Sequence, residues 1–352
     1  GTCDLWNSTF ASGIDPAKGC LTDFSSFGAG GALPFATIPP EEIYDPEDNP
    51  DGWRCTVWES NVAITGRDPD TGFARSGYDN EGVMYGLDAL AAGVITGDQF
   101  VDLNGAIGGF DADGQPVPER SVVDDDLPQR AYETGRVVGD QGGLPDTPAI
   151  LVNVYTDEMG DIHDRVRAFS ILDRLGGEDG ETPAAVSLWT IGLPEGSSLI
   201  ATLTGALGDF AAQPVLALDE WLTAAESHQA DQGGSWQEAL AASRPEAAES
   251  RCEPVGEEAI VGPEANADPA CTAAFPVHEE PRMAAGAPRA GDVLKCALVP
   301  VDESTDLAAA DPTGAQLAQL EEIFPTGVCD YSRPGVGATD LADTWYDFGA
   351  DG

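Results

Sequence analysis

The stretch from Pro148 to Leu175 constrains the fold more than any other part of the chain. An apolar run from Ala149 to Val154, rich in β-branched residues, is too short for a helix and predicts a buried strand. Acidic and glycine residues follow, and apolar residues then recur at helical spacing. A second apolar run, over residues 184–191, predicts a neighbouring parallel strand. A strand, a helix and a parallel strand form a right-handed βαβ unit, which indicates the α/β class.

The loop after the first strand carries the candidate chemistry. Asp161 stands where a helix N-cap is expected, so the helix should begin near Ile162. Asp157, Asp161 and His163 would then lie at the carboxyl end of a central strand, where open α/β sheets bind ligands. His163 is a candidate general base, because histidine exchanges protons near neutral pH and the chain has only three. The alternative is a solvated histidine paired with Asp161 or Asp164.

The net charge of the chain limits the partners that it can bind. The chain has 62 acidic residues against 16 basic ones, a formal net charge of −46, and the acidic residues recur along the whole sequence. An acidic surface of this kind repels itself in dilute buffer, whereas at molar salt the Debye length falls to about 3 Å and the repulsion is screened. We therefore predict a halophilic protein and exclude nucleic acid and anionic membranes as partners. No apolar run approaches the roughly 20 residues that a membrane helix needs.

The cysteines favour an oxidising compartment. Seven are present with no C-x-x-C pair, so disulfides fit better than a zinc site and imply a secreted, extracellular protein. Proximity in the sequence suggests that Cys252 pairs with Cys271 and that Cys296 pairs with Cys329. The odd number leaves one cysteine free, or paired with a segment that this sequence lacks. The sequence has no dinucleotide-binding, Walker A or H-E-x-x-H motif, and we expect no cofactor.

The remaining pattern predicts further helices and one more strand. Thr96 should cap the second helix of an αα-hairpin. Residues 244–270, acidic and rich in Ala and Pro, are expected to form a loop. The expected helices cover residues 81–93, 96–108, 128–136, 214–225, 236–242 and 313–324, and the expected strand covers residues 293–299.

Eight blocks of the chain resemble one family. They are GTCDLW, GRDPDTGFAR, DNEGVMYGLDAL, QFVDLNGAIGGFDADG, RAYETGRV, GDIHDRVRAF, AGAPRAGDVLKCAL and IFPTGVCDYSRPGVG, and they run from Gly1 to Gly337. These blocks are similar to the tannase-like group of secreted α/β-hydrolases, a family still largely of unassigned function. The resemblance covers almost the whole chain, but it corresponds to the second half of the family's usual sequence.

The resemblance implies the C-terminal half of an α/β-hydrolase fold. Residues 1–140 would form a cap, residues 141–243 the core, and residues 244–352 a disulfide-tethered segment packing on the core. In that fold the nucleophilic serine stands on a G-x-S-x-G turn, and this sequence contains no such motif. The serine is therefore expected on a separate N-terminal portion of the same precursor, with the acid and the base within residues 148–163.

In this interpretation His163 takes the proton of the serine, and Asp161 or Asp157 orients the imidazole. His278 is the second choice for the base, because the resemblance extends to it and a disulfide-tethered loop would reach the site. The expected function is a secreted serine ester hydrolase that acts on a small-molecule or polymeric ester.

Two alternatives stay open. The chain would be a non-catalytic extracellular binding or surface protein if it kept the hydrolase scaffold and lost the chemistry. A weaker alternative is a calcium-stabilised module that uses aspartate turns such as Asp111 to Asp113, or the acidic loop from Asp45 to Gly52.

Overall fold

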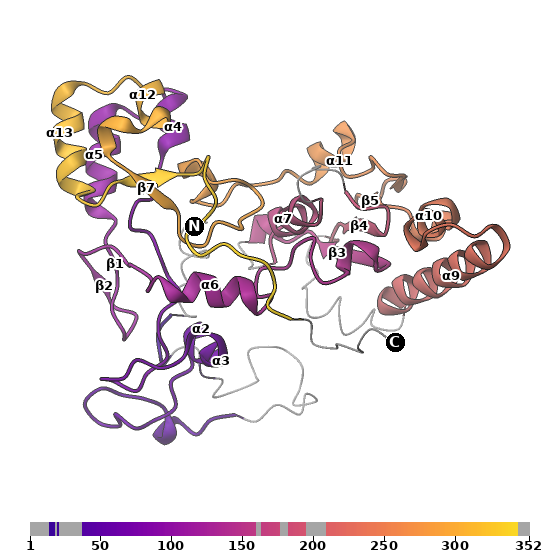
Figure 1. The fold of residues 1–352 in the computed structure, drawn as a ribbon, viewed down its shortest axis with the longest axis horizontal. Coiled ribbons are helices and arrows are strands. Elements are labelled where there is room, and N and C mark those ends of the chain that lie inside the picture. The colour runs from indigo at the N-terminus through magenta and orange to yellow at the C-terminus, as the bar shows by residue number, and fades with distance from the viewer. Residues whose placement is uncertain are drawn as a thin grey trace. The chain divides into compact units, whose positions relative to one another are not determined.

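The computed structural model describes residues 14–17, 20, 37–159, 163–176, 182–194 and 209–343. Contacts divide the chain into two units (Figure 1). Of the described residues, unit 1 contains those within Val138–His278, and unit 2 contains those within Phe10–Val137 and Glu279–Gly352. The expected division into a cap, a core and a C-terminal segment stays a prediction.

Unit 1 is built on a mixed sheet, which confirms the α/β class. Its strands are β3 (Ala149–Val154), β4 (Val186–Ile191), β5 (Arg251–Glu253) and β6 (Ile260–Val261), in the spatial order β3-β4-β5-β6. β3 and β4 are parallel over their full length, β4 and β5 are parallel, and β5 and β6 are antiparallel. Helix α7 (Val166–Leu175) joins β3 to β4, so the predicted βαβ unit is present.

Two further helices cover one face of this sheet. They are α9 (Asp209–Gln232) and α10 (Trp236–Ser243), and the second begins with a capping box at Ser235. Their core surrounds Trp221, which is 0% exposed and donates its indole N–H to the carbonyl of Leu240 at 2.9 Å. Ile150 of β3 and Trp189 of β4 pack in the same cluster. The remaining elements of unit 1 are the short helices η4 (Leu144–Asp146), η5 (Asp157–Met159), η7 (Glu246–Ala248) and α11 (Pro269–Ala274).

Two predictions in unit 1 are wrong. Residues 244–270 are not a loop throughout, because β5 and β6 lie there and β5 extends the sheet. Helix α7 begins at Val166 rather than near Ile162. The carboxylate found at its start is Asp157, which accepts the backbone N–H of Arg165 at 2.8 Å. Asp161 lies outside the described residues.

Unit 2 is assembled from segments far apart in the sequence. The αα-hairpin forms its core with the C-terminal helices, through buried apolar residues that include Phe100, Leu307, Leu320 and Phe324. Thr96 caps α5 with a capping box, as predicted. The elements of this unit are η3 (Pro40–Glu42), α2 (Val57–Ser60), α3 (Val62–Thr65), α4 (Leu87–Ala91), α5 (Gly97–Ala106), β1 (Gly109–Phe110), β2 (Pro116–Val117), α6 (Asp126–Glu133), η8 (Met283–Ala285), β7 (Ala297–Val299), η9 (Val301–Glu303), α12 (Thr305–Ala309), α13 (Gly314–Ile323) and β8 (Val328–Asp330).

Three disulfides join described cysteines. Cys252–Cys271 lies in unit 1 and Cys296–Cys329 in unit 2, both as predicted, and the sequence analysis did not foresee the pair Cys20–Cys55. Disulfides are consistent with an extracellular location. Among the helices of the described residues, none has the length and apolar character needed to cross a bilayer.

Candidate active site

A half-buried carboxylate, that of Asp157, lies at the carboxyl end of β3. Asp157 opens the short helix η5, three residues beyond the end of the strand. Its Oδ1 accepts the backbone N–H of Arg165 at 2.8 Å, while its Oδ2 is buried and has no hydrogen-bond partner in the described part of the chain. A buried oxygen that lacks a partner is costly, and a catalytic role is one of the explanations for such an atom.

The charged groups that act on Asp157 include a histidine. Burial raises the pKa of Asp157, and the N–H of Arg165 and the positive charge of His278 act in the opposite direction. The charge of Arg165 also lowers the pKa of Asp157. His278 is exposed and lies near enough for its charge to act on the carboxylate. The histidine whose charge acts on Asp157 is therefore His278, the second choice from the sequence.

Tyr155 is a neutral hydrogen-bond donor next to this carboxylate. Burial raises the pKa of Tyr155 to about 12, and the negative charges of Asp157 and Glu158 act in the same direction. Its hydroxyl donates to the carbonyl of Pro276 at 3.1 Å, and its ring packs against Phe275 with the centroids 5.0 Å apart. Tyr155 therefore joins the end of β3 to the segment that leads to His278.

Arg165 makes the second connection to that segment, and the sequence analysis did not single it out. Its side chain is 0% exposed. Nη1 donates to the carbonyl of Phe275, and Nη2 donates to the carbonyl of Asn266 at 3.2 Å and to the Sγ of Cys271 at 3.4 Å. The only signal in the sequence was its place in the block GDIHDRVRAF, since an arginine that follows several acidic residues normally suggests an exposed ion pair.

The Cys252–Cys271 disulfide fixes the base of the same segment. Cys252 lies in β5, and Cys271 lies in α11, four residues before Phe275. Asn266 lies inside the disulfide loop and donates to the carbonyl of Leu188 at 2.8 Å, and it accepts from the hydroxyl of Thr190 at 2.6 Å. The loop is therefore tied to β4 and β5.

The other predicted site residues lie as follows. His163 is exposed, and its backbone carbonyl accepts from the side chains of Asn153 at 3.4 Å and Thr156 at 3.3 Å. Asp164, the alternative partner considered for it, pairs with Arg167 at 3.0 Å. Asp161 cannot be placed, because residues 160–162 are outside the described ranges. Roles for His163 and Asp161 stay predictions.

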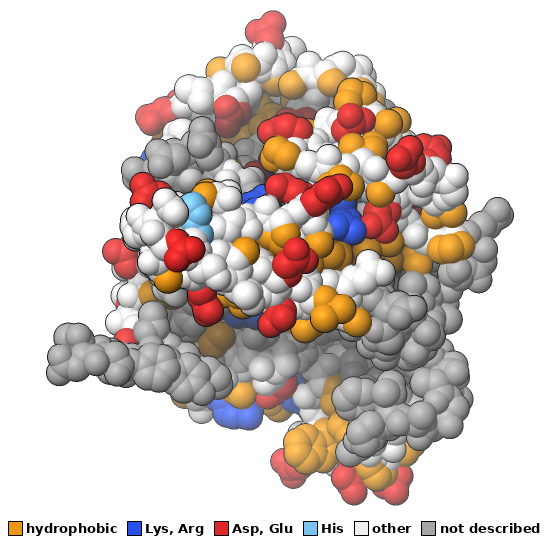
Figure 2. Space-filling model, turned by 90° about the vertical axis from the view of Figure 1, so that its right-hand side faces the viewer, with side chains coloured by type: hydrophobic (Ala, Val, Ile, Leu, Met, Phe, Trp, Pro, Cys, Tyr) orange, Lys and Arg blue, Asp and Glu red, His pale blue; other side chains and the backbone are white. Residues whose placement is uncertain are grey.

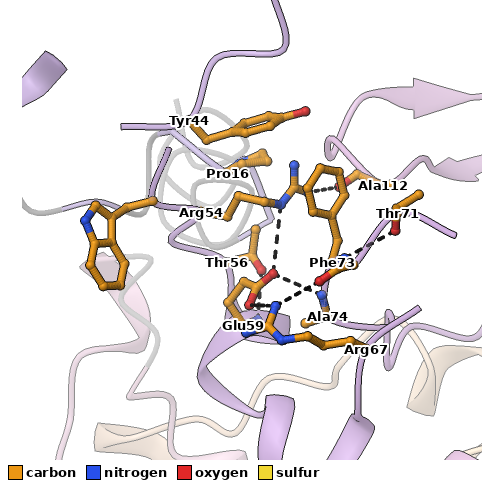
Figure 3. Close-up of polar contacts among 12 residues, drawn as sticks. Pro16, Tyr44, Arg54, Thr56, Glu59, Arg67, Thr71, Phe73, Ala74 and Ala112 are labelled. Carbon is orange, nitrogen blue, oxygen red and sulfur yellow. Dashed lines mark hydrogen bonds and ion pairs between the residues drawn. The ribbon is translucent and has the colours of Figure 1, made fainter. Parts of the chain in front are cut away.

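The aspartate turns considered for calcium bind donors of the protein itself. Asp113 accepts from the hydroxyl of Tyr44 at 2.9 Å and from Nη1 of Arg54 at 2.8 Å. Figure 3 shows the guanidinium of Arg54 between the rings of Tyr44 and Phe73, whose centroids lie 4.3 and 3.7 Å from its carbon. Asp111 accepts the backbone N–H of Asp113 at 2.9 Å, as in an Asx turn. Within the described ranges, no group of three or more His, Cys, Asp or Glu side chains is placed to hold a metal ion.

Unit 1 is an α/β unit, because a helix joins its parallel strands β3 and β4. The half-buried carboxylate of Asp157, on which the charge of His278 acts, gives this unit a candidate acid–base site. The chain belongs to the tannase-like family of unknown function, whose sequence profile matches residues 1–340. That assignment confirms the resemblance seen in the sequence blocks. No curated protein and no solved structure matches the chain.

Proposed function

We propose that the chain is the C-terminal part of a secreted ester hydrolase and that it supplies the acid–base residues for a serine on a separate N-terminal portion of the same precursor. The observation that carries the proposal is Asp157, half-buried beyond the carboxyl end of a parallel strand, with the charge of His278 acting on it. This is the arrangement in which a carboxylate orients an imidazole. The description of the family as tannase-like supports an ester of an aromatic acid as the substrate.

The mechanism is acyl transfer. The serine oxygen of the N-terminal portion attacks the ester carbonyl while the imidazole of His278 takes the hydroxyl proton. The same imidazole then gives this proton to the leaving alcohol, and a water molecule hydrolyses the acyl-enzyme by the same steps. Asp157 holds the imidazole in the required orientation and stabilises its cationic form. The donors that stabilise the oxyanion belong to the N-terminal portion.

The edge of the sheet supports a partner portion. Within the described residues, β3 hydrogen-bonds to β4 alone, so its other edge presents backbone N–H and C=O groups that can pair with a further strand. Val152 in the middle of β3 is 37% exposed. We propose that a strand of the N-terminal portion pairs with this edge and brings the serine to the site.

The halophilic character is part of the proposal. The net charge of −46 supports it, and the face drawn in Figure 2 has many Asp and Glu side chains among apolar and uncharged ones, with few Lys and Arg. The three disulfides support secretion.

The experiment replaces each histidine of the complete precursor in turn. H278A and D157N should each abolish ester hydrolysis, H278A should leave the melting curve in molar salt unchanged, and H228A should keep full activity. If H163A abolishes activity and H278A does not, the base is His163 and the assignment of His278 is wrong. A serine-reactive fluorophosphonate should label an accompanying N-terminal chain; if no chain is labelled, the non-catalytic binding protein is the correct alternative.

A further inference from the structure

Two consecutive backbone carbonyls that precede His278 are held by side chains next to Asp157. The hydroxyl of Tyr155 donates to the carbonyl of Pro276 at 3.1 Å, and the guanidinium of Arg165 donates to the carbonyl of Phe275. Tyr155 lies two residues before Asp157, and the backbone N–H of Arg165 binds the Asp157 carboxylate. The same two residues therefore contact both the strand end that carries the acid and the segment that carries the histidine.

Burying an arginine between two segments carries a large free-energy cost. Removing a guanidinium from water is unfavourable, and apolar residues of similar volume often pack at least as well. Here the guanidinium binds neutral oxygens, and its Nε has no hydrogen-bond partner in the described part of the chain. Packing alone does not explain a buried arginine at this position. The planar guanidinium donates hydrogen bonds at defined angles, so it can fix the orientation of the carbonyls of Phe275 and Asn266.

We propose that Arg165 and Tyr155 form a carbonyl clamp that positions His278 against Asp157. The inference rests on the proposed function, in which these two residues are the base and its orienting acid. Arg165 and Tyr155 are positioning residues, because neither is required to touch the substrate. The disulfide loop gives the clamp a fixed base, since the Sγ of Cys271 also accepts from Arg165 at 3.4 Å.

The clamp can be tested without substrate or serine, by measuring how strongly His278 acts on Asp157. Besides His278, the charged and titratable groups that act here are Arg165, Tyr155 and Glu158. The pKa of Asp157 is followed by carbon NMR of the 352-residue chain, labelled at the aspartate carboxyl carbons, in molar salt. The resonance that disappears in D157N is the resonance of Asp157.

A double-mutant cycle isolates the effect of the clamp. H278A should raise the pKa of Asp157, because it removes a positive charge that lowers it. In the Y155F background, H278A should raise the pKa of Asp157 by about half as much or less, because Tyr155 no longer holds the segment of His278 in place. H228A is the matched control and should leave the pKa of Asp157 unchanged in both backgrounds.

Arg165 variants separate position from charge. R165M removes both the fork and the charge, whereas R165K keeps the charge and loses the fork. The effect of H278A should fall in both backgrounds, and if R165M does not fold, R165K and Y155F decide the question.

An effect of H278A that is the same size in wild type, Y155F and R165K would overturn the clamp, and so would an effect found with H163A instead of H278A. The result does not depend on catalysis: loss of coupling in this chain, together with no detectable esterase activity in the complete precursor, would support the clamp and contradict the proposed function.

Discussion

Removing either of two disulfides should destabilise the protein by a similar amount, but only one removal should abolish catalysis. The chain-entropy model relates the effect of a disulfide to the length of the loop that it closes. Cys252–Cys271 spans 19 residues and Cys296–Cys329 spans 33. The model gives stabilisations of ~3.2 and ~3.7 kcal/mol at 25 °C for loops of these lengths. The pair C296A/C329A is therefore a matched control for C252A/C271A.

The two variants should differ in activity because of what each loop carries. The loop closed by Cys252–Cys271 ends four residues before Phe275, whose carbonyl accepts a hydrogen bond from Arg165. Loss of this disulfide should therefore let the segment that carries His278 move. A displacement of about 1 Å at a catalytic group costs about a hundredfold in rate. We expect about that loss of kcat in C252A/C271A, and less than about a threefold change in C296A/C329A, which keeps the site intact.

The assay must report on each unit separately, because a chain with two units need not unfold in one step. Hydrogen exchange of peptides from unit 1 and unit 2 gives the free energy of opening for each. Activity is compared at a molar salt concentration at which the peptides of unit 1 remain protected. Equal losses of activity in the two variants, or no loss in either, would refute the reasoning that the Cys252–Cys271 loop positions the base.

Three further outcomes are expected. W221A should lower the free energy of unfolding of unit 1 by about 3–5 kcal/mol in urea, because a fully buried ring and its bond to Leu240 are lost; a loss below about 1 kcal/mol would contradict the packing. D157N should raise the melting temperature at neutral pH, because burial raises the pKa of Asp157 and its ionised form therefore opposes folding. This gain should vanish as the pH falls below the ordinary value of 3.8, where the carboxyl is protonated in both states, and a gain independent of pH would contradict the assignment. The wild-type melting temperature should rise between dilute buffer and molar salt, and a constant value would refute the halophilic interpretation.

The sequence predicted local features of both units well. β3 and β4 are apolar runs of the right length, and the helix between them has a regular apolar face, so each could be recognised from neighbouring residues alone. The pairs Cys252–Cys271 and Cys296–Cys329 were found because their members are close in the sequence. The capping box at Thr96 has an equally local signature.

Features that depend on distant residues could not be predicted. β5 has only three residues, and its place in the sheet depends on pairing with β4, which is remote in the sequence. Helix α7 starts late because Asp157, eight residues away, binds the N–H of Arg165. Nothing local indicates that Arg165 is buried or that its guanidinium reaches Phe275, so the contacts of the segment before His278 could be seen only in three dimensions.

The order of the segments has a consequence for biosynthesis. Unit 2 begins before residue 138 and is completed only after residue 278, so its first part leaves the ribosome long before the residues that finish its core. At roughly 5–20 residues per second, the intervening stretch of about 140 residues takes about 7–28 s to synthesise. During that interval Phe100 and its neighbours lack α12 and α13. A nascent chain arrested there should bind a chaperone that recognises apolar helices, and release should follow emergence of the last 70 or so residues.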